Sequence, residues 1–318
     1  MAGKRPTGTG RVSRRRTFVS RGRLVETGAL WDGGCVTAWD DFDFNSRGRR
    51  SVTQQRANTL LPTTRRDEDV HVSLVIPTKN EVRNIGWVLE RLPACVGEII
   101  VVDGQSTDGT VDVVRSIRPD SRIVMERRRG KGVAVRAGFA AARGRIVAMI
   151  DADGSMHPRE LDRFVGLLDT GFDLVKGSRF MSGGGSTDIT FVRRMGNSAL
   201  RMAANKMCRT RFSDLCYGYI AMHRRHVGRL DLDADGFEIE AQIVMRAWAA
   251  GLHVAEVPSV ETPRHHGDSN LRTFRDGHRV LKTLLRERAL NRGPAARPVL
   301  NIEHLVAPAS LPAEKVSA

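Results

Sequence analysis

An alternation of short apolar runs with segments of helical periodicity constrains this chain more than any other feature of its sequence. From residue 70 onward, apolar runs of four to six residues are separated by longer stretches with helical spacing. Connections of that length let successive strands lie parallel while the helices cover the sheet. The pattern therefore predicts an α/β fold with a mainly parallel sheet flanked by helices.

The alternation is regular over residues 70–176 and less regular afterwards. Strands are expected over 71–76, 98–102, 122–125, 145–150 and 173–176. The expected helices between them cover 81–92, with Asn80 as its N-cap, and 108–117, 131–142 and 158–168. Further on, we expect helices over 190–207, 237–250 and 271–290 and strands over 216–222 and 253–257.

The chain is strongly basic, with 51 Lys and Arg against 36 Asp and Glu and a formal net charge of +15. Residues 1–69 are basic and show little periodicity, so they are predicted to form a disordered arm. A single domain is expected over 70–290 and a flexible tail over 291–318. A basic excess attracts anionic lipid, phosphorylated substrates or nucleic acid. A genomic preference for Arg codons explains it equally well.

The four cysteines and the absence of long apolar runs bear on the compartment. No two cysteines form a CxxC pair, no secretory signal is visible, and no apolar run reaches the length of a membrane span. We therefore expect reduced thiols in a cytoplasmic protein, whose contact with a membrane would be peripheral.

Asp151 and Asp153 directly follow the apolar run 146–150. In an extended chain, residues two apart point to the same side, and parallel sheets bind ligands at the carboxyl ends of their strands. Carboxylate oxygens suit Mg²⁺ or Mn²⁺, which bind proteins through carboxylates and substrate phosphates together. The pair therefore predicts a metal and phosphate site, with a surface turn stabilised by Asp side chains as the alternative.

Two further segments end strands in the same way. Asp103 follows the run 98–102 and is expected to accept hydrogen bonds from a base or ribose, whereas Asp108 is expected to cap the next helix. Lys131 lies between two glycines at the start of an Ala-rich helix. Glycine permits close approach of the backbone, and a helix N-terminus favours an anion. A solvated basic turn fits this segment equally well.

The order of these segments resembles that of family-two glycosyltransferases, and of polyprenyl-phosphate sugar transferases in particular. The matching segments are 75–81 (VIPTKNE), 103–110 (DGQSTDGT), 130–132 (GKG), 151–153 (DAD), 176–180 (KGSRF) and 214–219 (DLCYGY). The resemblance implies a GT-A fold, a nucleotide-binding sheet with a C-terminal acceptor-side subregion. It also implies a UDP- or GDP-sugar donor, Mg²⁺ or Mn²⁺, and inversion at the anomeric carbon.

The resemblance also implies roles for individual residues. Donor-binding residues by position are Pro77, Thr78, Glu81, Asp103, Lys131 and Asp151. Asp153 would bind the metal, with His265 or His266 as a further ligand unless these are ordinary loop histidines. The segment 263–271 resembles a phosphate-binding Arg–Gly–Ser loop, although Asn270 stands where many relatives carry Lys. Acceptor or phosphate contacts are expected from Arg179, Arg264 and Ser269.

The need for a general base depends on the acceptor. A hydroxyl acceptor needs a base within hydrogen-bond reach, whereas a phosphate acceptor is already an anion. Asp214 is the first candidate for a catalytic base, with a turn or cap carboxylate as its alternative. Glu238 and Glu240 are further candidates, but two residues apart at a helix start they cannot both face the site. Stabilisation of the helix dipole is the alternative for either.

The resulting prediction is a metal-dependent enzyme that transfers a sugar to a polyprenyl phosphate at the inner membrane face. Basic residues in the arm and in 272–288 would hold it on anionic lipid. A soluble small-molecule or saccharide acceptor is the main alternative, and a nucleotidyltransferase is the alternative from another class. A nucleic-acid partner is not expected, because clustered carboxylates repel phosphate unless a metal is present. A Rossmann dehydrogenase is not expected either, because no GxGxxG follows the first strand.

Overall fold

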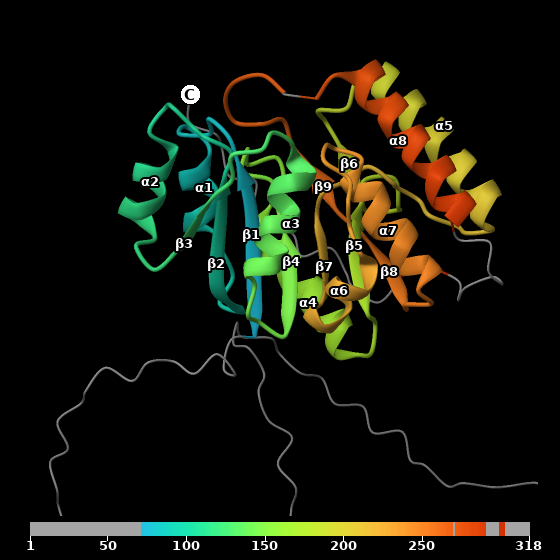
Figure 1. Ribbon diagram of the computed structural model, residues 1–318, viewed down its shortest axis with the longest axis horizontal. Coiled ribbons are helices and arrows are strands. Elements are labelled where there is room, and N and C mark those ends of the chain that lie inside the picture. The colour runs from blue at the N-terminus through green and yellow to red at the C-terminus, as the bar shows by residue number, and fades with distance from the viewer. Residues whose placement is uncertain (1–70, 270, 291–298, 303–318) are drawn as a thin grey trace, which may run out of the picture. The chain divides into compact units, whose positions relative to one another are not determined.

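The expected sheet is present in the computed structural model, which describes residues 71–269, 271–290 and 299–302 (Figure 1). In spatial order its strands are β10 (Leu300–Asn301), β8 (Val254–Pro258), β5 (Leu174–Ser178), β7 (Ile220–His223), β4 (Ile146–Met149), β1 (Val72–Thr78), β2 (Val96–Asp103) and β3 (Arg122–Met125). All neighbouring strands run parallel except β7, which is antiparallel to β4 and β5. The predicted mainly parallel GT-A-type sheet is confirmed.

The register of the central strands brings their carboxyl ends to one edge of the sheet. Thr78 at the end of β1 lies opposite Asp103 at the end of β2. Val75 of β1 lies opposite Met149 of β4, two residues before Asp151. Side chains that leave these ends therefore converge on a single region, as the sequence pattern predicts.

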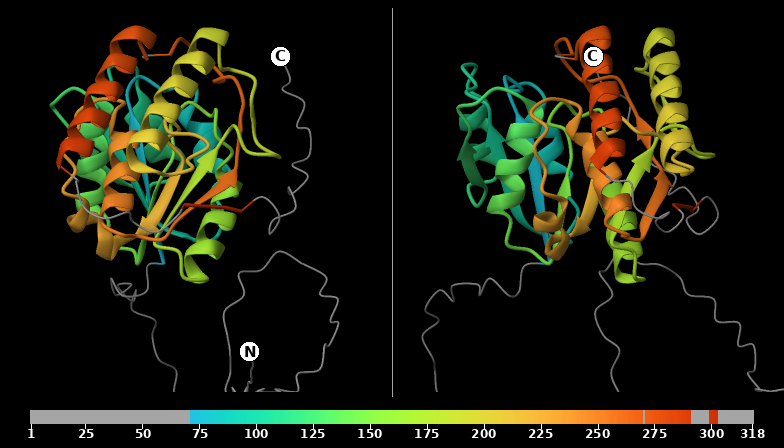
Figure 2. Two further views of the ribbon diagram at one scale, coloured as in Figure 1. Left: turned by 90° about the vertical axis from the view of Figure 1, so that its right-hand side faces the viewer. Right: turned by 45° about the vertical axis from the view of Figure 1, so that its right-hand side comes forward.

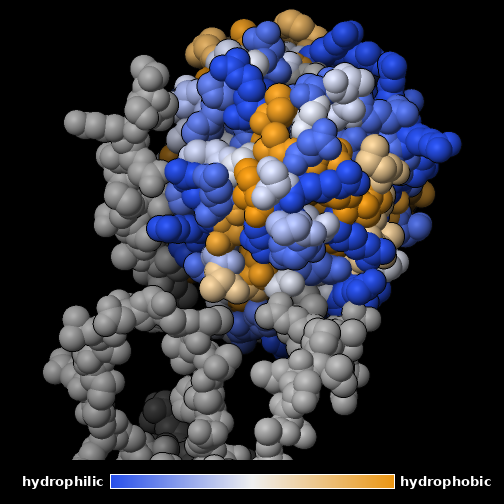
Figure 3. Space-filling model, turned by 90° about the vertical axis from the view of Figure 1, so that its left-hand side faces the viewer, coloured by the Kyte–Doolittle hydropathy of each residue, from blue (hydrophilic) through white to orange (hydrophobic). Residues whose placement is uncertain are grey.

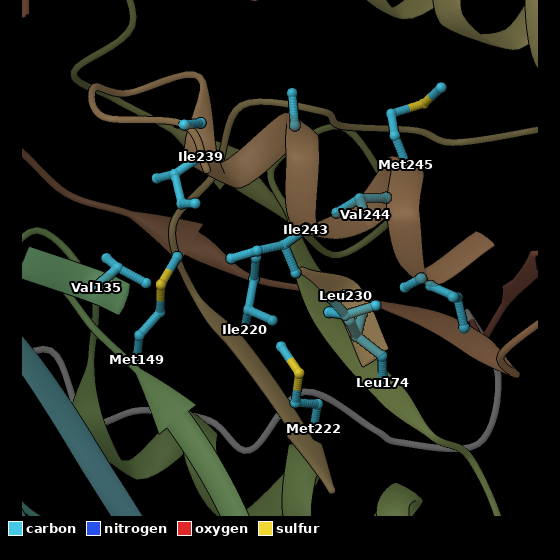
Figure 4. Packing of buried hydrophobic residues seen from close by; sticks show 14 of the residues in the cluster. Val135, Met149, Leu174, Ile220, Met222, Leu230, Ile239, Ile243, Val244 and Met245 are labelled. Atoms are coloured by element: carbon cyan, nitrogen blue, oxygen red, sulfur yellow. The ribbon is translucent and has the colours of Figure 1, made fainter. Parts of the chain in front are cut away.

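Helices cover both faces of the sheet, because alternate strand residues point to opposite sides. On one face lie α1 (Ile85–Glu90), α2 (Thr110–Ile117) and α4 (Leu161–Asp169). The short 3-10 helix η2 (Pro158–Glu160) lies between β4 and α4 in the chain. The other face carries α3 (Lys131–Ala141), η3 (Arg224–His226), α6 (Val227–Leu230) and α7 (Ile239–Ala249). In Figure 4, Ile239 and Ile243 of α7 pack over Ile220 of β7 and Met149 of β4.

Two long helices lie side by side next to this core, as Figure 2 shows for α5 (Phe191–Cys208) and α8 (Thr273–Leu290). A small parallel sheet of β6 (Gly185–Ser186) and β9 (Val260–Glu261) precedes both. The buried Glu287 of α8 accepts hydrogen bonds from Gln242 and Arg246 of α7, at 2.8 and 2.9 Å. These bonds attach α8 to the sheet-covering helix.

Two local predictions need correction or refinement. Asn80 does not cap α1, which begins only at Ile85. Its backbone is left-handed (φ 55°), and its side chain accepts the N–H of Thr107 at 3.0 Å. The Asn80 side chain therefore stabilises the loop after β2 instead of the start of α1. Asp108 is not the N-cap of α2 either, because the helix begins at Thr110 with Gly109 as its N-cap, but the carboxylate of Asp108 accepts the N–H of Thr110 at 3.0 Å.

The C-terminal segment differs in part from the expected flexible tail. Leu300–Asn301 forms β10 at the edge of the sheet beside β8. The reason is apolar burial, because Val299 packs into the core on one face and Ile302 into the core on the other. The expected arm over 1–69, and the tail apart from 299–302, lie outside the described residues.

The face that carries α1, α2 and β3 shows mixed polarity, with a narrow apolar streak between hydrophilic residues (Figure 3). On the sheet face that α3 shares with α7, α3 packs closely on β1 and β2 through Gly138. A Cβ atom at Gly138 would overlap with the side chain of Val75 and lie 3.0 Å from that of Val102. The helix therefore depends on a residue without a side chain at this position.

Replacing Gly138 by Ala is expected to lower the free energy of unfolding. Overpacking of a core costs about 1–3 kcal/mol. The higher helix propensity of alanine relative to glycine stabilises by up to about 1 kcal/mol, so the cost is expected to exceed the gain. Gly166→Ala in α4 is the matched control, because no atom lies within 4 Å of its Cβ position, and it should stabilise. Urea denaturation compares the two; equal stabilities would contradict this packing of α3.

Candidate active site

A cavity of about 740 Å³ opens at the carboxyl edge of the sheet. Its wall combines the ends of β1 and β4, the start of α3, the segment after β9 and parts of α5 and α8. The predicted site residues on its wall are Pro77, Thr78, Glu81, Lys131, Asp151, Asp153, Arg179, Arg264 and Ser269. The candidate base Glu240 lines it as well, whereas Asp103, Asp214, Glu238, His265 and His266 do not.

Lys131 joins two carboxylates on the cavity wall. Its ammonium lies 2.5 Å from Asp151 Oδ1, after β4, and 2.7 Å from Glu240 Oε1 in α7. Burial opposes the charge of Lys131, but these carboxylates outweigh it and raise its pKa above the ordinary value. Lys131 therefore stays protonated and is shared by the two acids, while burial still raises the pKa of Asp151.

Gly218 makes room for this group. A Cβ atom there would lie 2.8 Å from Lys131 Nζ and 2.9 Å from Glu240 Oε1. The expectation that only one of Glu238 and Glu240 faces the site agrees with the geometry. Glu238 instead accepts the N–H of Gly236 and lies 3.7 Å from Arg279.

The glycines around Lys131 serve a different purpose from the one expected. The N–H of Gly132 donates to the carbonyl of Asp235 at 2.9 Å, and Val133 donates to the same oxygen at 3.3 Å. A Cβ atom at Gly130 or Gly132 would overlap with this neighbouring backbone. The start of α3 is therefore packed against residues 234–236, which counts against an anion site on the N–H groups of Gly132 and Val133, while the Lys131 side chain still faces the cavity.

Asp153 lies on a tight turn beside the loop that follows β9. Its Oδ1 accepts the N–H of Ser155 at 3.0 Å, and its carbonyl accepts that of His265 at 3.2 Å. The His265 ring packs against Gly154, where φ is 78°, and its centroid lies 4.6 Å from that of Trp87. Burial and the neighbouring His266 lower the pKa of His265, which favours the neutral ring.

The two predicted histidines thus differ. His265 is adjacent to Asp153, whereas His266 is exposed and contributes its carbonyl, which accepts bonds from Asn84 and Arg264 at 3.0 and 2.9 Å. Within the described ranges, no group of three or more His, Cys, Asp or Glu side chains could hold a metal. The protein would supply few ligands, as is usual when substrate phosphates complete the coordination of Mg²⁺.

Arg264 and Glu81, expected to contact different parts of the ligands, contact each other. The guanidinium lies 2.8 and 2.9 Å from the two carboxylate oxygens. Arg264 also donates to the carbonyl of Asp268 at 2.8 Å. This ion pair, in which one guanidinium nitrogen contacts both oxygens, attaches the loop after β9 to the segment before α1, and phosphate contact by Arg264 would require exchange of that partner.

Asp214 lies behind Arg179 rather than at the cavity. It is fully buried, and its two oxygens accept from Arg179 at 2.7 and 3.1 Å. Burial opposes its ionisation, but Arg179 outweighs this and lowers the pKa of Asp214. A buried carboxylate with such a partner is a poor base, so the geometry does not fit the catalytic role expected of Asp214.

Arg179 itself is occupied by protein groups. Besides Asp214, it donates to both oxygens of Glu261 at 3.2 Å and to the Cys216 carbonyl at 2.6 Å. This arrangement positions the strand ends rather than offering donors to a phosphate. The geometry therefore also counts against the predicted acceptor contact of Arg179.

Asp103 ends β2 in a fully buried position, where Oδ2 accepts the N–H of Ser106 at 2.9 Å. Its Oδ1 is buried without a hydrogen-bond partner among the described residues. An unsatisfied buried acceptor costs about 1–3 kcal/mol, so this oxygen favours a ligand that can donate to it.

Several cavity residues were not expected from the sequence. Arg193 and Asn197 come from α5, one helical turn apart, and Arg272 and Arg275 from the start of α8. Asn197 Oδ1 is buried and lacks a partner in the part of the chain that the structure describes. The spacing of Arg193 and Asn197 was the only signal available in the sequence.

Comparisons with known proteins agree with this geometry. Residues 73–230 match the model of glycosyl transferase family 2. The chain is 30% identical to glycosyltransferase AglJ of Haloferax volcanii over 69% of its length and 73% of that protein. It is 33% identical to the polyprenol monophosphomannose synthase of Mycolicibacterium smegmatis, over 67% and 83%.

A solved structure is similar as well. It is glucosyl-3-phosphoglycerate synthase from Mycobacterium tuberculosis in complex with Mn²⁺, UDP and glucosyl-3-phosphoglycerate, with a TM-score of 0.55 and 26% identity. The similarity covers 70% of this chain and 81% of that one. The family match removes the grounds for a nucleotidyltransferase. The chain belongs to glycosyl transferase family 2 and is a glycosyltransferase.

Proposed function

We propose that this glycosyltransferase transfers a sugar, with inversion, from a UDP- or GDP-sugar to the phosphate of a polyprenyl phosphate. The observation that carries the proposal is the division of the cavity. The carboxylates of Asp151 and Glu240, which bind Lys131, and that of Asp153 lie on the sheet side, and arginines in and next to α5 and α8 lie on the other. One side suits a nucleotide diphosphate and the other an anionic acceptor.

On the donor side, Asp103 and Thr78 would hold the nucleoside, and Asp151 with Lys131 would contact nearby donor groups. The unpartnered Asp103 oxygen supports this assignment. The carboxylate of Asp153 on the cavity wall fits Mg²⁺ or Mn²⁺, with the neutral His265 ring beside it. Such an ion, when bound, neutralises charge on the departing nucleoside diphosphate. Mn²⁺ and UDP accompany the similar synthase structure.

On the acceptor side, Arg193, Arg272 and Arg275 would hold a phosphate. The guanidinium of Arg193 makes only long contacts, to Thr273 Oγ1 at 3.4 Å and the Leu271 carbonyl at 3.5 Å. No ion pair joins these three arginines to a carboxylate within the described ranges, unlike Arg179 and Arg264. An incoming phosphate therefore meets guanidinium groups that no carboxylate binds, on a wall that also includes Asp188 and Asp276.

A phosphate acceptor also suits the shortage of bases. Its oxygen would attack the anomeric carbon opposite the leaving diphosphate, forming one carbon–oxygen bond as the other breaks, with no proton to remove. Asp214 is bound to Arg179, and Glu240 is bound to Lys131. Neither needs to act as a base in this reaction.

The choice between acceptors depends on the apolar part of the wall. Ile189, Leu200, Leu271 and Val280 line the cavity near the arginines, which favours a prenyl chain over a wholly polar acceptor. The polyprenol monophosphomannose synthase relative supports the same choice. A soluble phosphorylated acceptor is the second candidate, because the similar synthase structure contains glucosyl-3-phosphoglycerate.

The proposed location is the inner membrane face, with the protein attached peripherally. None of the helices in the described ranges combines the length and the apolar character needed to cross a bilayer.

Asp153→Asn is expected to reduce turnover at least about 100-fold, because it removes a ligand for the ion that stabilises the departing diphosphate. Release of nucleoside diphosphate from a panel of UDP- and GDP-sugars, with Mg²⁺ or Mn²⁺ and after chelation, measures the effect. Asp112→Asn on the exposed side of α2 is the control and should behave as wild type. Undiminished turnover by Asp153→Asn would rule out the metal assignment.

Arg193→Ala is expected to raise the KM for the acceptor about 10- to 100-fold and to leave the donor KM unchanged, since charged hydrogen bonds contribute about 1.5–3 kcal/mol. The assay uses a short-chain polyprenyl phosphate in detergent, with 3-phosphoglycerate in a parallel arm. Arg115→Ala, on the exposed side of α2, is the matched control. Transfer to 3-phosphoglycerate alone would replace the lipid acceptor with the soluble one.

A further inference from the structure

Exposed apolar side chains concentrate on the two helices beside the cavity. Among the described residues, eight of the eleven large exposed apolar side chains lie there: Phe191, Val192, Met195, Met202, Phe274, Leu281, Leu285 and Leu290. Phe274 is 85% exposed and Phe191 75%, so these rings are almost wholly outside the protein. Solvent-exposed apolar patches of this kind mark sites of contact with a partner protein or a membrane.

The spacing of these residues places them in stripes. In α8, Leu281 and Leu285 follow Phe274 by seven and eleven positions, which brings all three to one helix face. In α5, Met195 and Met202 follow Phe191 by four and eleven positions, with the same result. The opposite faces of both helices are buried in the core. Each helix therefore carries a second apolar face that packs against nothing described.

The exposed charge on the two helices themselves has one sign. Helix α5 contains no Asp or Glu, and both acids of α8, Asp276 and Glu287, are buried. The exposed charged side chains of the helices are basic, such as Arg194, Lys206 and Lys282, and the exposed Asp188 lies in the segment before α5. Two copies of such a surface would repel each other, whereas anionic lipid headgroups would attract it.

The two helices run in the same direction, with their starts at the cavity. Arg193 near the start of α5 contacts Thr273 at the start of α8, and both residues line the cavity. Figure 2 shows the helices side by side on the same face of the domain. The apolar stripes therefore begin next to the cavity wall, on α8, which the Glu287 bonds hold in place, and on α5, which packs against α8.

We propose that the outer faces of α5 and α8 form a docking surface for an anionic lipid bilayer. Phe191, Met195, Met202, Phe274, Leu281 and Leu285 enter the interfacial region, and the neighbouring basic side chains contact headgroups. This inference goes beyond the proposed reaction, because adhesion needs neither donor nor acceptor. It places the arginine side of the cavity next to the membrane.

Co-sedimentation of the full chain with vesicles tests the proposal. The vesicles contain phosphatidylglycerol and phosphatidylcholine, with pure phosphatidylcholine as the comparison and no prenyl phosphate. Binding is expected to the anionic vesicles, weakening as salt rises. The triple variant Met195→Gln, Phe274→Gln, Leu281→Gln should bind them at least about tenfold more weakly, because each change removes apolar area from the interface. Met125→Gln, 59% exposed on β3, is the matched control.

Both proteins contain residues 1–69, so their difference reports on the helix pair alone. Equal binding by wild type and triple variant, with unchanged melting temperatures, would overturn the proposal. So would a wild-type dimer, detected by light scattering, that the triple variant converts to a monomer, because the surface would then bind a second copy. Failure of sugar transfer leaves this measurement unaffected, so the two proposals fail separately.

Discussion

The ammonium group of Lys131 connects three separate parts of the cavity wall. Lys131 is the first residue of α3, and its ammonium group lies 2.5 Å from Asp151 after β4 and 2.7 Å from Glu240 of α7. Without that charge, two carboxylates would face each other across a buried space, which is unfavourable. Gly218 leaves room for the group, so the strand end, two helices and the segment before β7 are arranged around one cation.

Charge compensation then separates the two halves of the site. On the sheet side, Lys131 and Arg264 are paired with carboxylates, and Arg179 is saturated by Asp214 and Glu261. These groups maintain geometry rather than attract an anion. Arg193 of α5, Arg272 just before α8 and Arg275 within it have no such partners among the described residues, whereas Arg279 of α8 lies 3.7 Å from Glu238. The apolar outer faces of the same helices extend this division, because they place the uncompensated charge beside a surface suited to lipid.

Much of the fold followed from local patterns. Strand ends at Asp103 and Asp151 and the helix starting at Lys131 were predictable, because apolar periodicity stops where these polar residues begin. Predictions that needed partners were less successful. Asp214 has the residue type of a base, but Arg179 occupies it. The GKG segment has the composition of an anion site, but the backbone of residues 234–236 fills it. Nothing in the local sequence distinguishes these outcomes.

The sequence by itself determined the order of strands and helices and the carboxylates at strand ends, because both depend on residues close together in the chain. Only the tertiary structure decided which charges meet. Lys131 and Glu240 are 109 positions apart, and Glu81 and Arg264 are 183 positions apart. Such pairs depend on strand order and helix packing, which arise from the whole core. For the same reason, Arg193 and Arg275 became recognisable as site residues only once α5 and α8 were seen beside the sheet.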